Sequence, residues 1–167
     1  RRFWPKPTIH VQKEKEEMKM GKVFIIAEAG SNWRVGTAAR DLKMANTMID
    51  VAKESGADAV KFQTYRANTV YVSNAGMSDY LSDKGIREPI TEIFKDLAMP
   101  YEMIPKLAKH CRKRGIEFMS SAFSEDDFKA VDPFVLRHKI ASYEITHTLL
   151  LKLAAKSKKP LILSTGA

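Results

Sequence analysis

Cysteine is nearly absent from this 167-residue sequence: Cys111 is the only one, so no disulfide can form within the chain. A chain without internal disulfides is typical of a reducing compartment. Cys111 lies among helix-forming residues, which favours a buried structural thiol over a nucleophile. No stretch reaches the roughly 18 consecutive apolar residues that a membrane span needs, and the basic N-terminal region lacks the apolar core of a signal peptide. We therefore expect a cytoplasmic protein with no membrane partner.

Nucleotide-binding and nucleic-acid-binding motifs are also missing. No Gly-x-Gly-x-x-Gly follows a predicted strand, no Gly-rich loop leads into Lys-Ser or Lys-Thr, and no zinc-finger spacing or basic zipper occurs. The formal charge of +8 is concentrated in residues 1–22 and in a second basic cluster over residues 106–114. Such clusters also suit an anionic small substrate or a solvated helix face. We expect no nucleic-acid partner.

The sequence does contain a repeated pattern of strands and helices. A composition of 44% hydrophobic and 29% charged residues suits one globular domain, which we place at residues 21–167 after an N-terminal extension at residues 1–20. The continuous apolar run at residues 23–27 predicts a strand that is covered on both faces. The other predicted strands cover residues 59–65, 116–121, 138–144 and 161–166. The predicted helices cover residues 40–55, 88–97, 101–114 and 148–157, and a short one opens at Glu125.

The fold class follows from the polar residues that end these strands. Parallel strands joined by helices form right-handed β-α units, and TIM barrels build their sites at the carboxyl ends of the strands. Eight units need about 250 residues, whereas this sequence holds about five units. We predict an α/β fold of the (β/α)8 TIM-barrel type, incomplete. Open sheet edges are aggregation liabilities, so we expect residues 1–167 alone to be inactive and either to oligomerise or to be part of a longer chain.

The predicted strand at residues 59–65 carries two polar side chains in an apolar context. In an extended chain Lys61 and Gln63 point to one face, and Val60 and Phe62 point to the other. A buried lysine is costly unless it is paired or bound to an anion. The pattern predicts a pocket at the carboxyl end of a parallel strand; an edge strand with a solvated lysine is the alternative.

Other strands also end in groups that could bind a ligand. Glu28 directly follows the first predicted strand, before a glycine-containing turn, which is where α/β proteins place ligand groups. Ser121 ends the third predicted strand. In the fourth, Lys139 and Ser142 differ in parity, so both can face one pocket only if the strand ends or bulges between them.

Four segments together resemble the N-acetylneuraminate (sialic acid) synthase family. They are residues 26–32 (IAEAGSN), 56–64 (GADAVKFQT), 139–144 (KIASYE) and 163–166 (LSTG). Each motif alone is weak, but four in order over residues 23–167 are specific. The resemblance implies a TIM barrel that condenses phosphoenolpyruvate with an N-acylated aldose such as N-acetylmannosamine. The product is a nine-carbon 2-keto-3-deoxy sugar acid of the sialic acid type, and phosphate is released by C–O cleavage. The family also implies a small antifreeze-like domain that reaches the partner subunit's site, and hence a homodimer in the full-length form.

The resemblance also implies roles for individual residues. The positions that match phosphoenolpyruvate ligands are Lys61, Ser121, Lys139, Ser142 and Ser164. Two lysines with hydroxyl donors are a suitable cradle for a small trianion. Three positions match catalytic residues: Glu28 contacts the sugar, and Gln63 and Glu144 lie beside the reacting carbons. Glu144 is placed to manage a proton when water adds at C2.

A divalent metal, Mn²⁺ or Mg²⁺, is implied by the family, in which it polarises the aldehyde. The family's metal-binding histidines come from the later half of the barrel, so we expect the ligands to lie outside this chain. The four histidines of this sequence lack the helical pair spacing of metal ligands, and each is predicted to be structural or exposed: His10, His110, His138 and His147.

Two residues depart from the family pattern. Trp33 stands where the family often has a histidine, and Tyr143 stands where a small residue is common. Tyr143 could narrow the sugar pocket or alter the acceptor.

Three alternatives to the synthase remain open. The first is a class I aldolase-type barrel, in which Lys61 or Lys139 forms a Schiff base with a keto acid. The second is a truncated, non-catalytic module that binds an anion or a carbohydrate. In the third, the polar strand ends are only caps and solvated turns.

Overall fold

The computed structural model describes residues 23–77, 82–83, 85 and 87–166, and the predicted N-terminal extension lies outside them. Five parallel strands form one sheet, in which they lie in the same order as in the sequence. The strands are β1 (Ile26–Gly30), β2 (Ala59–Thr64), β3 (Glu117–Ala122), β4 (His138–Ile140) and β5 (Leu161–Leu163). Consecutive parallel strands that are also neighbours are the arrangement of the first units of a (β/α)8 barrel, which confirms the predicted fold class.

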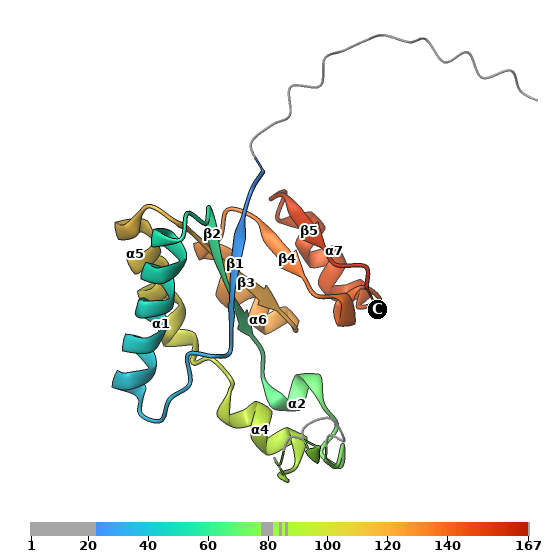
Figure 1. Cartoon of the computed structure of the whole chain (residues 1–167). Coiled ribbons are helices and arrows are strands. Elements are labelled where there is room, and N and C mark those ends of the chain that lie inside the picture. Colours follow the sequence, from blue (N-terminus) through green and yellow to red (C-terminus); the bar gives the residue numbers. More distant parts are fainter. Residues whose placement is uncertain (1–22, 78–81, 84, 86, 167) are drawn as a thin grey trace, which may run out of the picture.

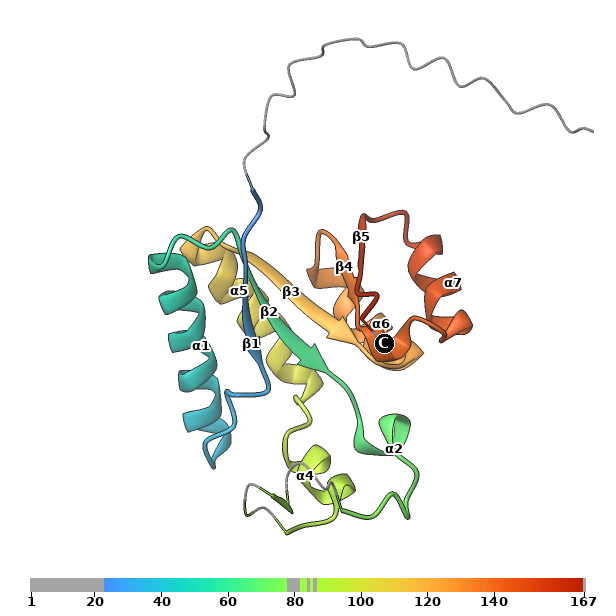
Figure 2. The ribbon, with the colours of Figure 1, turned by 45° about the vertical axis from the view of Figure 1, so that its right-hand side comes forward.

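Helices connect these strands. They are α1 (Ala38–Glu54), α2 (Ala67–Val70), α4 (Ile90–Asp96), α5 (Ile104–Arg114), α6 (Glu125–Val131) and α7 (Thr148–Lys156). Three short 3-10 helices accompany them: η1 (Tyr101–Met103), η2 (Asp132–Phe134) and η3 (Ser142–Glu144). Figures 1 and 2 show α1 beside α5 along β1–β3, and α7 beside β4 and β5. The short helices α2 and α4 extend beyond the carboxyl end of β2 (Figure 1). No helix in the described part of the chain is long and apolar enough to cross a membrane.

The main hydrophobic core lies between the first three strands and the helices α1 and α5. Ile49 of α1 and Leu107 of α5 are fully buried against Phe62 of β2 and Phe118 of β3. Burial of one such side chain contributes about 1.5–3 kcal/mol. The helical spacing that predicted α1 is therefore confirmed. Gly56, with a φ of +84°, ends this unit in a left-handed conformation that suits glycine.

The helix predicted at residues 101–114 is present, as η1 followed by α5. Gly115 ends it with a φ of +67°. Cys111 of α5 is buried in the main core, as predicted for a structural thiol. Burial is the principal cause that raises the pKa of this thiol to about 12.

The prediction for the first strand was wrong in its bounds, which were residues 23–27. β1 begins at Ile26, and the three residues before it are exposed: Val23 (73%), Phe24 (40%) and Ile25 (54%). These exposed fractions show that the segment is not covered on both faces within the described residues, where β1 is also an edge strand of the sheet. One residue of this apolar segment has a cation–π contact: the Phe24 ring lies under the guanidinium of Arg137.

The fourth strand is shorter than predicted. It ends at Ile140, and Ser142–Glu144 turn into the 3-10 helix η3. Lys139 and Ser142 could face one pocket only if the strand ended or bulged between them, and the strand does end between them.

In its described residues, the long connection between β2 and α5 includes the short helices α2 and α4. The helix predicted at residues 88–97 is α4, at Ile90–Asp96. Its Phe94 ring lies 5.1 Å from the buried ring of Tyr65 and 4.7 Å from that of Tyr71. These aromatic contacts hold α4 against the carboxyl end of the sheet.

Candidate active site at the carboxyl end of the sheet

The strand register places five polar side chains on one face of the sheet. Glu28 lies opposite Lys61, Gln63 lies opposite Ser121, and Ser121 lies opposite Lys139. Register partners on adjacent parallel strands point to the same face, and side chains two residues apart on one strand share a face. The five therefore form one polar row across four strands on one face of the sheet.

Lys61 is at the centre of this row. Its strand lies between β1 and β3, so the alternative of an edge strand with a solvated lysine is wrong. The side chain is only 13% exposed, and its ammonium group forms an ion pair with the carboxylate of Glu28, which is 49% exposed. On the opposite face, Val60 and Phe62 are buried in the main core. The predicted division of this strand into a polar and an apolar face is confirmed.

Lys139 is held on the far side of the same row. Its Nζ donates to Ser164 Oγ, just after β5, and to the backbone oxygen of Ile140, both at 2.6 Å. Burial lowers the pKa of Lys139, and the positive charge of Lys61 lowers it further, whereas Glu28 raises it. Two partly desolvated ammonium groups therefore face a common space, and an anion in that space would stabilise both.

The side chains of two adjacent serines in β3 point to opposite faces of the sheet. Ser120 points to the helix side, where its hydroxyl lies 2.8 Å from Thr64 Oγ1 in a buried hydrogen bond. Ser121 is also buried, but it lies on the site face between Gln63 and Lys139. Within the described residues neither Gln63 nor Ser121 has a side-chain hydrogen bond.

The remaining two predicted site residues lie in the turn after β4. Glu144 is 15% exposed, and its Oε2 accepts a hydrogen bond of 2.6 Å from Nδ1 of His147. Ser142 is half-buried. No described contact joins Ser142 or Glu144 directly to Lys139; the chain brings them to the carboxyl end of β4.

The two departures from the family pattern lie outside this row. Trp33 is 2% exposed and packs in the main core, and its indole Nε1 has no hydrogen-bond partner among the described residues. Tyr143 is 89% exposed, so it does not narrow a pocket within the described part of the chain.

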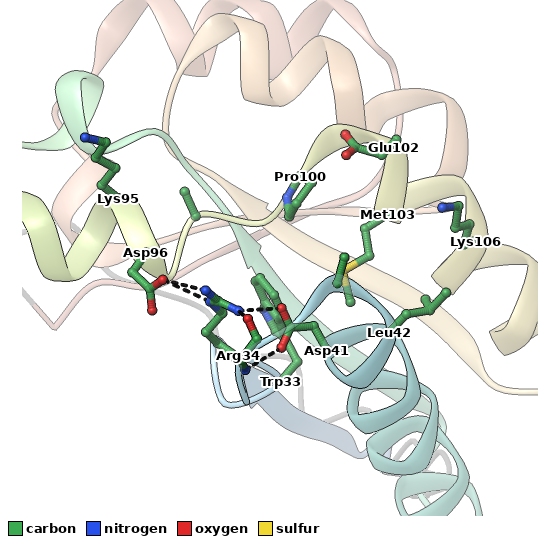
Figure 3. A pocket seen from close by; sticks show the side chains of 13 residues that line it. Trp33, Arg34, Asp41, Leu42, Lys95, Asp96, Pro100, Glu102, Met103 and Lys106 are labelled. Carbon is green, nitrogen blue, oxygen red and sulfur yellow. Dashed lines mark hydrogen bonds and ion pairs between the residues drawn. The ribbon is translucent and has the colours of Figure 1, made fainter.

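A second polar cluster, shown in Figure 3, was not predicted from the sequence. Arg34, in the loop after β1, donates to Asp96 at the end of α4 (2.7 Å) and to Asp41 in the first turn of α1 (2.8 Å). Burial by itself raises the pKa of Asp41, but hydrogen bonds from the Val35 and Gly36 amides and from Arg34 hold it below its usual value. The cluster borders a hollow of about 390 Å³ beside Trp33 and Met103 (Figure 3). It ties the first helix to the long connection that carries α4.

Three described histidines each pair with one carboxylate. His110 lies 2.7 Å from Asp50, and the buried His138 lies 2.9 Å from Asp132; the third is the pair of His147 and Glu144. Burial lowers the pKa of His138. No group of three or more His, Cys, Asp or Glu residues in the described ranges could hold a metal ion. These donors do not fit a divalent metal, and His10 lies outside the described residues.

Comparison with known sequences relates most of the chain to one family. Residues 48–167 match the NeuB family. Over 151 residues the chain is 39% identical to the spore coat polysaccharide biosynthesis protein SpsE of Bacillus subtilis, a match that covers 89% of this chain and 38% of the relative. Over 146 residues it is 40% identical to the N,N'-diacetyllegionaminic acid synthase of Legionella pneumophila, covering 86% of this chain and 39% of the relative.

A solved structure agrees with these sequence relatives. The N-acetylneuraminic acid (sialic acid) synthetase of Leptospira borgpetersenii, in complex with citrate, superposes with a TM-score of 0.71 at 30% identity. The match covers 87% of this chain and 45% of that protein. The chain thus spans about two-fifths of the length of the curated relatives it matches.

Proposed function

Because this chain belongs to the NeuB family, we propose that it carries part of the active site of a synthase that condenses phosphoenolpyruvate with an N-acylated amino sugar. The product is a nine-carbon 2-keto-3-deoxy sugar acid, and inorganic phosphate is released. The relatives named above include a synthase of a diacetylated sugar acid of this kind. The acceptor is proposed as a class, N-acetylmannosamine or a similar N-acylated aldose.

The observation that carries the proposal is the pair of lysines on one face of the sheet. Lys61 and Lys139 come from different strands, both are largely removed from solvent, and the positive charge of Lys61 lowers the pKa of Lys139. Phosphoenolpyruvate carries a carboxylate and a phosphate, so it offers each ammonium group an anionic partner. The hydroxyl groups of Ser121, Ser142 and Ser164 would supply further donors around it.

The proposed chemistry forms one C–C bond and exchanges one C–O bond at C2, where the bond to the water oxygen forms and the bond to the phosphate oxygen breaks. The former aldehyde oxygen takes up one proton and becomes a hydroxyl group. C3 of phosphoenolpyruvate attacks the aldehyde carbon of the sugar, and the oxygen of a water molecule adds at C2. Phosphate then leaves with the oxygen that joined it to C2. Glu28 would contact the sugar, Gln63 would lie beside the reacting carbons, and Glu144 would hold or transfer the proton of the attacking water.

The family implies a divalent metal, Mn²⁺ or Mg²⁺, that supplies Lewis acidity at the aldehyde when it is bound. The described residues do not offer a suitable donor set, so we propose that its protein ligands lie outside this chain. We also propose that the full-length enzyme is a cytoplasmic homodimer that binds neither nucleic acid nor membrane.

One observation favours a second candidate, the class I aldolase. Lysines that form Schiff bases need a lowered pKa, and the pKa of Lys139 is lowered by burial. The hydrogen bonds of Lys139 argue against this candidate. Its Nζ donates to Ser164 and to a backbone oxygen, as a protonated ammonium group does, whereas a Schiff base forms from the neutral amine.

An isotope experiment separates these functions. The protein that carries this chain is incubated with Mn²⁺, N-acetylmannosamine and phosphoenolpyruvate labelled with ¹⁸O at the oxygen between C2 and phosphorus. The synthase predicts that the label leaves in inorganic phosphate and that a nine-carbon keto acid appears in the mass spectrum. A parallel sample with pyruvate and borohydride tests the aldolase: covalent reduction onto Lys61 or Lys139 would refute the synthase. Binding of phosphoenolpyruvate without phosphate release, with this and other N-acylated aldoses, would favour the non-catalytic module.

A further inference from the structure

The turn after β4 joins an imidazole to the carboxylate proposed to manage the proton. His147 is the N-cap residue directly before α7, and its backbone N–H donates to the backbone oxygen of Glu144 at 3.0 Å. The side chain does not cap the helix. Its Nδ1 instead donates to Glu144 Oε2 at 2.6 Å, a short, charge-assisted hydrogen bond. The same two residues are thus bonded through both backbone and side chains, which fixes the carboxylate in one orientation.

The outer side of this imidazole borders open space. His147 is 35% exposed and lines a hollow of about 600 Å³ between the loops that follow β2, β3 and β4. Nδ1 is bonded to Glu144, and no hydrogen bond within the described residues engages the other ring nitrogen, so that nitrogen can exchange a proton with solvent. The carboxylate itself is only 15% exposed. The imidazole is therefore the better-solvated member of the pair.

The charges around the hollow balance. Its charged lining residues are Arg66, Glu125, Asp126 and Lys129, and Tyr101 adds a phenol. Lys129 pairs with Asp126 at 3.2 Å, and Arg66 donates to the backbone oxygens of Tyr65 and Met99 while its guanidinium covers the Tyr101 ring. No excess of either sign faces the imidazole from these elements, so its dominant charged neighbour is Glu144.

The other two described histidine–carboxylate pairs lie elsewhere. His110 joins Asp50 between α5 and α1, on the outer helices. His138 joins Asp132 at the start of β4, at the end of the strand away from the turn, and it is buried. In the described part of the chain, His147 is thus the histidine whose carboxylate partner belongs to the proposed site.

We propose that His147 is a positioning residue of the synthase: it holds the Glu144 carboxylate toward the reacting carbons and exchanges that group's proton with the adjoining hollow. The inference rests on the proposed function. Its chemistry needs no further reactant, because the proton passes between water, Glu144 and the imidazole.

The test uses the protein that carries this chain and two substitutions. His147→Ala removes both the hydrogen bond and the imidazole, whereas His147→Gln keeps an N–H donor but lacks the imidazole. We expect His147→Ala to lower kcat for phosphate release by about tenfold to a hundredfold, the range for a lost hydrogen bond to a charged group. The KM for phosphoenolpyruvate should not change. His147→Gln should recover part of kcat, and both variants should have a pH profile of kcat that differs from that of the wild type.

His110→Gln is the matched control, because it removes an imidazole bonded to a carboxylate outside the site. It should leave kcat and the pH profile unchanged. If the wild type turns over and His147→Gln keeps its kcat and pH profile, the inference is overturned while the proposed function stands. If the folded wild type neither binds phosphoenolpyruvate nor releases phosphate, the proposed function fails and the inference fails with it.

Discussion

At the scale of single residues, Lys61 is the clearest case of a side chain that the sequence alone could place. Lys61 alternates with Val60 and Phe62, so its side chain points away from the core that those two residues enter. Because its strand lies between two others, the charge of the partly buried lysine needs a partner. The structure supplies that partner in Glu28. The contact of Lys139 with Ser164 could not be predicted in the same way, because the two residues are 25 positions apart and meet only when β4 and β5 pair.

Cys111 gives a prediction at this scale. Burial raises the pKa of this thiol to about 12, so the thiol is protonated and unreactive near pH 8. We expect iodoacetamide to leave it unmodified in the folded protein and to alkylate it rapidly in denaturant, as measured by mass spectrometry. Cys111→Ser should show no labelling in either state. Rapid labelling of the folded wild type would contradict the burial of this helix face.

At the scale of elements, the helices were predicted more closely than the strands. α1, α5 and α7 follow the helical spacing of their buried residues and end at or near the predicted positions. The predicted bounds of β1 and β4 were wrong, because the hydrophobicity of a segment does not show where its hydrogen bonding to the neighbouring strand begins or ends. Val23 lies outside the sheet, since no pairing partner reaches it, and η3 follows β4 within two residues.

The link between α1 and α4 yields a pH-dependent prediction. The pKa of Asp41 is lower in the folded protein than its ordinary value of 3.8, owing to amide and Arg34 hydrogen bonds. A carboxyl group with a lowered folded-state pKa stabilises the fold fully above its unfolded-state pKa, and that contribution is lost as pH falls through the folded-state value. Asp41→Asn should therefore cost about 1–3 kcal/mol of unfolding free energy at neutral pH, and the difference from wild type should shrink in acid.

Urea unfolding at a series of pH values measures this difference. Glu92→Gln is the control, because Glu92 is exposed and has only a 3.7 Å ion pair with Lys95. It should have little effect at any pH. A cost for Asp41→Asn that is equal at neutral and acidic pH would mean that packing, and not the charge of the carboxylate, stabilises this junction.

At the scale of the whole molecule, the order of the motifs predicted both the fold class and the family. Each motif ends a strand, and parallel neighbours bring those ends to one edge of the sheet. The sequence therefore predicted which lysine and serine side chains share the edge of the sheet where we propose that a small anion binds. The division between an extension and a folded part at residues 20 and 21 stays a prediction, since it falls outside the described residues. Of the acceptor contacts the motifs predicted one, Glu28, and they predicted no metal ligand, because the family places its metal-binding histidines in the later half of the barrel.

The central claim is that the two lysines form a site for phosphoenolpyruvate. Isothermal titration calorimetry of phosphoenolpyruvate into the folded protein that carries this chain tests it most directly, with inorganic phosphate as the comparison ligand. Lys152→Ala, an exposed lysine of α7, is the matched control for Lys139→Ala. We predict saturable binding to wild type and Lys152→Ala, with an affinity at least about tenfold lower for Lys139→Ala. Equal binding by Lys139→Ala, or no binding by the folded wild type, would contradict the account.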